Sequence, residues 1–207
     1  MNILLTGSHG FIGSALVKYL SSRGHILHVL VRRAPQNDRE LSWNPPQREI
    51  QGIPTCDAII HLAGESILGR WTSEKKKNIL ESRVQGTQFL AELLSKMAYP
   101  PKVFISASAI GFYGNRSDEK LDEDSLKGRG FLSDVCQAWE SASEPAKRRG
   151  IRTVHLRIGM VLGKHGGALK RQLLPFRLGL GGRMGDGKQF VSWIVLEDMG
   201  RIVEFLL

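Results

Sequence analysis

The chain has 207 residues, of which 42% are hydrophobic and 24% charged, and its two cysteines lie far apart. This composition is typical of a globular protein and excludes a mainly disordered chain, a disulfide scaffold and a multi-cysteine zinc module. The formal net charge is +9, but the basic residues are scattered without interleaved aromatic residues, which argues against a nucleic-acid partner. The first apolar run, 3–5, is too short for a signal peptide or a membrane span, so a cytoplasmic protein without a membrane partner is expected.

Apolar runs of strand length alternate with longer helical patterns along the chain. The expected strands are 2–5, 26–31, 57–62, 102–106, 153–158 and a run near 190–195. The expected helices are 11–23, 73–97, 131–149, a short one near 168–177 and one from 198 onward. Residues 34–56, which contain four prolines, and residues 111–128 are expected to be mostly loop. The alternation predicts an α/β fold with a doubly wound parallel sheet of the Rossmann type, in which ligands bind beyond the carboxyl ends of the strands.

A glycine-rich segment, TGSHGFIG at 6–13, follows the first expected strand and opens the first expected helix. In this context Gly7 allows the tight turn, Gly10 lets a pyrophosphate approach the backbone, and Gly13 lets the helix pack closely on the strand. The phosphates then face the N–H groups and the positive end of the helix dipole. The segment therefore predicts a dinucleotide site.

The end of the second expected strand bears on the choice between NAD and NADP. An acidic residue there would bind the ribose hydroxyls of NAD, but the strand ends in Val31, Arg32 and Arg33, and the next acid is Asp38. Two guanidinium groups are suited to a 2′-phosphate, so the sequence favours NADP as the cofactor. The alternative is a pair of solvated surface arginines.

Several short motifs occur in the order found in one known family. They are TGSHGFIG at 6–13, HLAG at 61–64, SAS at 106–108, YG at 113–114 and RIGMVLG at 157–163. Together they resemble the extended short-chain dehydrogenases/reductases, also called the NAD-dependent epimerase/dehydratase family. FLSDVCQAWE at 131–140 and LPFRLGLGG at 174–182 are similar to an atypical subgroup labelled "epimerase family protein".

The resemblance implies a set of cofactor-binding residues. Those expected around the diphosphate are Gly7, Gly10, Phe11, Ile12 and Gly13, and those at the adenosine end are Arg32 and Arg33. Those expected near the ribose and the nicotinamide are Leu62, Ala63, Gly64 and Glu65, with Arg83 standing where the family often has Asn.

The catalytic residues depart from the family pattern. The family's serine matches Ser108, with Ser106 as the fallback, and its expected role is to donate a hydrogen bond to a substrate oxygen. The family's Tyr-x-x-x-Lys pair, which supplies acid/base catalysis, falls on Leu132 and Cys136 and occurs nowhere in the chain. Tyr113 or Glu65 is the expected substitute acid/base.

Two domains and three functions are considered. We expect a dinucleotide-binding domain over 1–163 and the start of an incomplete substrate-side region over 164–207, because the apolar helical pattern at the end has no glycine stop. The hypotheses are an NADP-dependent oxidoreductase or epimerase acting on a small carbonyl or sugar-like substrate, a catalytically weak NADP(H)-binding or sensing protein, and a nucleic-acid binder. No metal site is expected, since the histidines, His165 included, lack ligand spacing with a carboxylate.

Overall fold

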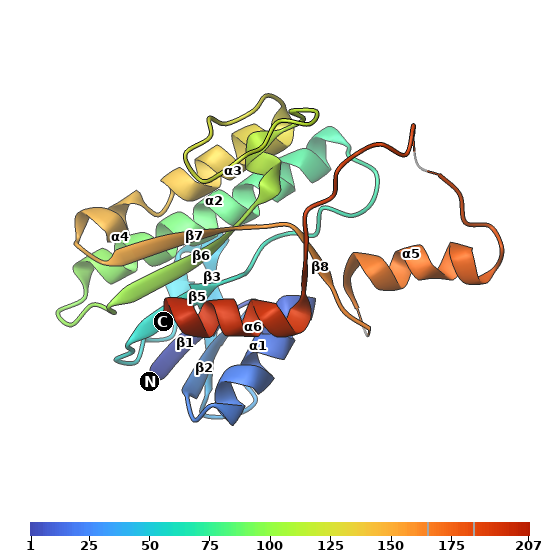
Figure 1. The fold of residues 1–207 in the computed structure, drawn as a ribbon. Coiled ribbons are helices and arrows are strands. Elements are labelled where there is room, and N and C mark those ends of the chain that lie inside the picture. Colours follow the sequence, from blue (N-terminus) through green and yellow to red (C-terminus); the bar gives the residue numbers. More distant parts are fainter. Residues whose placement is uncertain (165, 184) are drawn as a thin grey trace.

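A central sheet separates two layers of helices in the computed structural model, which describes residues 1–164, 166–183 and 185–207 (Figure 1). Its strands are β1 (Asn2–Thr6), β2 (Ile26–Val31), β3 (Glu40–Asn44), β4 (Glu49–Ile50), β5 (Ala58–His61), β6 (Val103–Ala109) and β7 (Arg152–Ile158). They lie in the order β4-β3-β2-β1-β5-β6-β7, and all neighbours are parallel except β4, which is antiparallel to β3. This arrangement confirms the doubly wound sheet.

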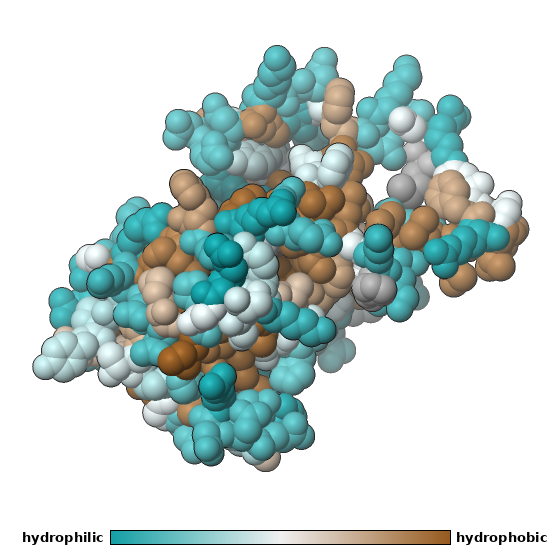
Figure 2. Space-filling view, turned by 60° about the horizontal axis from the view of Figure 1, so that its bottom comes forward, coloured by the Kyte–Doolittle hydropathy of each residue, from teal (hydrophilic) through white to brown (hydrophobic). Residues whose placement is uncertain are grey.

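Helices cover both faces of this sheet (Figure 1). One layer holds α1 (Phe11–Ser22) and α6 (Leu196–Leu206), and the other holds α2 (Ser73–Lys96), α3 (Phe131–Ser141) and α4 (Glu144–Arg148). A separate arm carries α5 (Gly167–Arg177), and a small parallel pair, β8 (Met160–Leu162) and β9 (Trp193–Val195), joins it to the sheet. Short 3₁₀ turns, η1 (Pro45–Gln47) and η2 (Ile110–Tyr113), follow β3 and β6. Figure 2 shows hydrophobic surface on this arm, where exposed apolar side chains include Leu174, Phe176, Leu178 and Leu180.

The core lies on both sides of the sheet because successive side chains of a strand point to opposite faces. In β1, Leu4 packs towards α2, while Ile3 and Leu5 pack towards α1 and α6. All three are fully buried. Such short, continuously apolar strands are typical of a parallel sheet that is covered on both faces. No helix in the described ranges combines the length and the apolar content that crossing a bilayer requires.

Some expected elements differ from those observed. Residues 34–56 were expected to be mostly loop, but they contain β3 and β4, which extend the sheet at its edge. The helix expected over 131–149 is divided into α3 and α4, because Pro145 lacks the N–H group that would continue the helical ladder. The strand expected over 102–106 extends to Ala109, which places Ser108 inside β6 rather than after it.

Candidate functional site: a dinucleotide cradle and a buried polar network

The three glycines of the first loop have distinct geometric roles. Gly7 has a φ of +76°, and a Cβ there would lie 2.9 Å from the carbonyl carbon of Leu62, so the turn both needs this conformation and passes close to the β5 loop. A Cβ at Gly13 would lie 2.1 Å from the Gly7 carbonyl oxygen, which requires glycine for close packing of α1 on the loop. Gly10 is exposed at the amino end of α1.

The amino end of α1 is open. Gly10 is the N-cap residue and accepts the N–H of Ser14 at 2.9 Å, and no side chain of the described residues caps the helix. The first turn of α1 contains no acidic residue. Its leading N–H groups therefore face away from the helix without a side-chain acceptor, which is the arrangement that binds a phosphate group.

Phe11 and Ile12, at the start of α1, pack against the rest of the protein. The ring of Phe11 lies against the loop that follows β8, since a Cβ at Gly163 would come within 2.7 Å of it. Ile12 packs at the edge of the core that surrounds α1 and α6. We call the glycine loop 7–13 and the first turn of α1 the cradle. The packing of Phe11 and Ile12 fixes the position of this first turn.

Thr6 joins the two loops that flank this cradle. Its Oγ1 atom accepts the N–H groups of Leu62 and Ala63, each at 3.1 Å, and therefore donates its own proton to Nδ1 of His61 at 2.7 Å. Burial lowers the pKa of His61 to about 3, so this imidazole is neutral. Sequence reasoning did not assign Thr6 a role, although its place directly before Gly7 is a usable signal.

The two arginines after β2 have different surroundings. Arg33 donates two hydrogen bonds to Glu40, at 2.6 and 2.7 Å. Arg32 is exposed, and within the described residues its guanidinium makes no hydrogen bond or ion pair. It is near enough to Glu65 to contribute to lowering the pKa of that carboxyl. Glu40 was not considered from the sequence because β3, which carries it, was not expected.

A second group of contacts forms after β5. Glu65 pairs with Lys75 at 2.6 Å, and this hydrogen bond lowers the pKa of Glu65, so it is a carboxylate at neutral pH. Arg83 donates to the Glu65 carbonyl oxygen at 2.9 Å and lies 5.0 Å from the centre of the Trp139 ring. Burial lowers the pKa of Arg83. A Cβ at Gly64 would lie 3.3 Å from the Arg83 guanidinium carbon, so the Arg83 side chain packs directly against the 62–65 segment.

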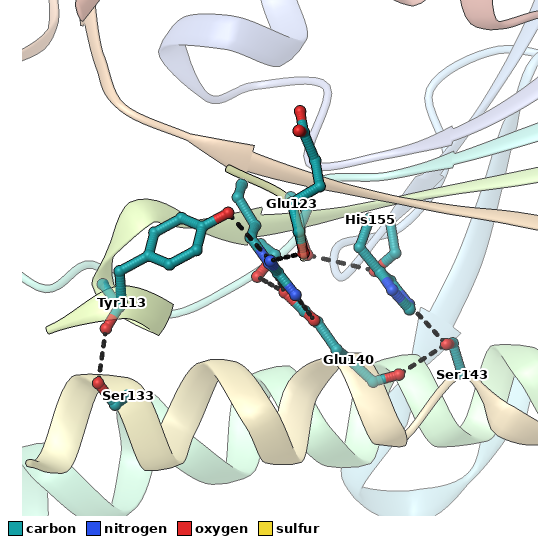
Figure 3. A network of polar contacts seen from close by, with 11 residues as sticks. Tyr113, Glu123, Ser133, Glu140, Ser143 and His155 are labelled. Atoms are coloured by element: carbon teal, nitrogen blue, oxygen red, sulfur yellow. Dashed lines mark hydrogen bonds and ion pairs between the residues drawn. The ribbon is translucent and has the colours of Figure 1, made fainter. Parts of the chain in front are cut away.

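A buried polar network joins the ends of β6 and β7 to α3 (Figure 3). Ser108 donates its hydroxyl proton to Glu140 at 2.6 Å, and Glu140 forms a two-pronged ion pair with Arg157 whose N–O distances are both 3.0 Å. Arg157 also donates to the hydroxyl of Tyr113 at 3.0 Å and stacks on the Phe112 ring at 3.6 Å. The network thus brings Ser108 and Tyr113 together, whereas Glu65 belongs to the separate group with Lys75.

The direction of each hydrogen bond defines what the network presents to a ligand. Ser108 is 3% exposed and gives its one hydroxyl proton to Glu140, and its expected role as a hydrogen-bond donor to a substrate oxygen stays a prediction. Tyr113 accepts from Arg157, so its own proton remains available. Burial raises the pKa of Glu140, but hydrogen bonds from Arg157 and Ser108 outweigh it and the net pKa lies below the ordinary value. Ser106, the fallback, is also buried and donates to the Ala107 carbonyl at 3.3 Å.

A hollow of about 220 Å³ has Arg157 in common with the network, but Leu156, Ile158 and Met199 in its lining belong to the core around α1 and α6. It lies where β7, β9 and α6 meet, and its lining includes Arg157, Ser192 and Trp193. The described residues contain no group of three or more His, Cys, Asp or Glu side chains that could hold a metal ion. His165, which was considered in the search for metal ligands, lies outside the described residues.

Comparison with known proteins places the chain in a family. The sequence profile described as "NAD dependent epimerase/dehydratase family" matches residues 3–207. The chain belongs to this family. Epimerase family protein ML0860 of Mycobacterium leprae is 40% identical over 208 residues, a match that covers 99% of this chain and 67% of the relative.

Two solved structures of the NAD-dependent epimerase/dehydratase type are similar to this chain. The crystal structure of human epimerase family protein SDR39U1 with NADPH has 37% identity and a TM-score of 0.87, and the match covers 99% of this chain and 69% of that one. A nucleoside-diphosphate sugar epimerase from Corynebacterium glutamicum has 37% identity and a TM-score of 0.85, covering 99% of this chain and 43% of that one. These matches confirm the extended short-chain dehydrogenase/reductase fold.

Leu132 and Cys136, which the sequence resemblance aligns with the family's Tyr-x-x-x-Lys pair, lie on the first turns of α3. The side chain of Leu132 packs close to Gly111, where an added Cβ would be 3.2 Å away. Cys136 is 3% exposed, and burial raises the pKa of its thiol. This stretch of α3 therefore serves as packing surface, and the polar groups next to it come from Ser108 and Glu140 instead.

Proposed function

We propose that this chain binds NADP(H), with the diphosphate at the amino end of α1 and the adenosine end beside Arg32. The observation that carries the proposal is the open first turn of α1 at Gly10, together with the exposed Arg32 guanidinium after β2, which has no ion pair among the described residues. Arg–phosphate contacts are strong, charge-assisted hydrogen bonds. The human relative that was crystallised with NADPH supports the same choice of cofactor.

The proposed reaction is oxidation or reduction at a hydroxyl or carbonyl carbon of a small, sugar-like substrate. The nicotinamide ring, when bound, supplies hydride transfer. Tyr113 acts as the acid/base, because Arg157 donates to its oxygen and leaves the phenol proton free to pass to a carbonyl oxygen. Ser108 supports this arrangement by donating its hydroxyl proton to Glu140, which pairs with Arg157. Ser192 and Trp193, which line the hollow that includes Arg157, contribute part of the substrate-side wall.

An alternative function is an NADP(H)-binding protein that turns over slowly or not at all. Two observations favour it: the family's tyrosine and lysine positions are occupied by Leu132 and the buried Cys136, and the Ser108 proton is engaged inside the protein. General acid–base help is worth about 10²–10⁴ in rate, so a protein without the usual pair is expected to be slow.

Calorimetric titration and a turnover assay test these proposals together. We expect NADPH to bind at least about tenfold more tightly than NADH, a difference of about 1.4 kcal/mol. Consumption of NADPH with a panel of small carbonyl and sugar compounds, lost in Tyr113→Phe, supports the enzyme. Tight NADPH binding without turnover supports the alternative. Equal affinity for both cofactors, or binding of neither, would overturn the proposed cofactor.

A further inference from the structure

The adenosine end of the cradle contains an acid that is already neutralised. Glu40 accepts both terminal nitrogens of Arg33, at 2.6 and 2.7 Å, and also accepts the backbone N–H of Gln36 at 2.8 Å. Its side chain is 10% exposed. The hydrogen bond from Arg33 holds the pKa of Glu40 below its usual range, so the group is a carboxylate at neutral pH.

The second N–H of each terminal nitrogen of Arg33 also has a partner. Besides Glu40, NH1 donates to the Ala34 carbonyl oxygen at 2.9 Å, and NH2 lies 3.4 Å from Nε2 of His9 in the glycine loop. A guanidinium has five N–H donors, so only the Nε–H of Arg33 is left. A two-pronged contact with a phosphate would require Arg33 to release Glu40. Arg32, by contrast, is exposed and has all its donors available among the described residues.

The position of Glu40 explains why such neutralisation matters. It lies opposite Val29 of β2 and is linked to the glycine loop through Arg33 and His9. A free carboxylate near the end of the second strand favours the ribose hydroxyls of NAD and repels a 2′-phosphate. In the ion pair with Arg33, the carboxylate oxygens of Glu40 are occupied and its charge is compensated.

We infer that the two adjacent arginines divide the selection of NADP over NAD between them, an inference that rests on the proposed function. Arg32 supplies the charge that contacts the 2′-phosphate. Arg33 is a positioning residue that acts through Glu40: it neutralises the acid that would otherwise select NAD. Its contact with His9 also joins the end of β2 to the glycine loop.

A double-mutant cycle with two cofactors tests this division. Dissociation constants of NADPH and NADH are measured by calorimetry for wild type, Arg32→Ala, Arg33→Ala, Glu40→Gln and the double variant Arg33→Ala/Glu40→Gln. We expect Arg32→Ala to weaken NADPH at least about tenfold and NADH less than about twofold. We expect Arg33→Ala to weaken NADPH as well, and the added Glu40→Gln to restore NADPH affinity to within about threefold of wild type.

The controls separate this inference from the proposed function. Arg39→Ala removes an exposed positive charge nearby and should change NADPH affinity less than about twofold. NADH binding by each variant reports that the cradle is folded. If wild type binds neither cofactor, the proposed function fails. If wild type prefers NADPH but the double variant stays as weak as Arg33→Ala, or Arg33→Ala loses nothing, or Arg32→Ala weakens both cofactors equally, the division of roles is wrong.

Discussion

Replacing Glu140 by alanine is expected to destabilise the protein strongly. The variant loses the hydrogen bond from Ser108 and both hydrogen bonds from Arg157, and it leaves a guanidinium whose side chain is 19% exposed without its carboxylate. Removing one partner of a buried ion pair costs about 3–5 kcal/mol. This pair is only partly buried and Arg157 keeps its contacts with Tyr113 and the Glu123 carbonyl, so the expected loss is about 2–3 kcal/mol.

Urea unfolding, followed by far-ultraviolet circular dichroism, measures this loss. Glu144→Ala is the matched control, because Glu144 lies just beyond α3 and its ion pair with Arg148 is exposed and 3.9 Å long. Its expected cost is under about 1 kcal/mol. Equal losses for the two variants would refute the reasoning, because the buried ion pair would then contribute no more than a surface pair.

The same variant has a predicted pH signature. The pKa of Glu140 is lower in the folded protein than its ordinary value, so the unfolded chain binds its proton more readily as the pH falls. The stabilisation by Glu140 is therefore fully present above the unfolded pKa of about 4.3 and is lost as the pH falls through the folded value. The difference in stability between wild type and Glu140→Ala should shrink below about pH 4. A difference independent of pH would contradict the assigned charge.

Three further predictions concern the cradle and the buried groups. Gly10→Val should weaken NADPH binding about 10–100-fold and retain the circular dichroism spectrum, because the valine side chain would occupy the phosphate position. The control is Gly182→Val, which should leave binding unchanged, because Gly182 is exposed and no described atom lies within 4 Å of an added Cβ. Cys56 and Cys136 are 5% and 3% exposed, so neither thiol should react with Ellman's reagent at neutral pH until the protein is unfolded; rapid labelling of the folded protein would contradict their burial. Nitrogen NMR should find His61 neutral at pH 5 with its proton on Nε2, because Thr6 donates to Nδ1 and burial lowers the pKa to about 3; a charged ring at that pH would contradict this.

The order of the elements and the place of the cradle were predicted from local sequence patterns. Short apolar runs gave the strands β1, β2, β5, β6 and β7, because a parallel sheet covered on both faces requires continuous apolar residues. The glycine spacing at 7, 10 and 13 predicted the turn before α1, since the positive φ at Gly7 and the close packing at Gly13 require glycine. These are short-range constraints, and they are visible in a few neighbouring residues.

Contacts between distant segments were decided by the tertiary structure. Ser108, Glu140 and Arg157 come from β6, α3 and β7, and no spacing in the sequence indicates that they share a hydrogen-bond network. Arg33 and Glu40 meet because β3 pairs with β2, and β3 was not expected because prolines and polar residues surround it in the sequence. The hydrogen-bond partner of Ser108 also depends on this packing, because α3 on β6 brings the ionised Glu140 carboxylate within 2.6 Å of the hydroxyl that donates to it.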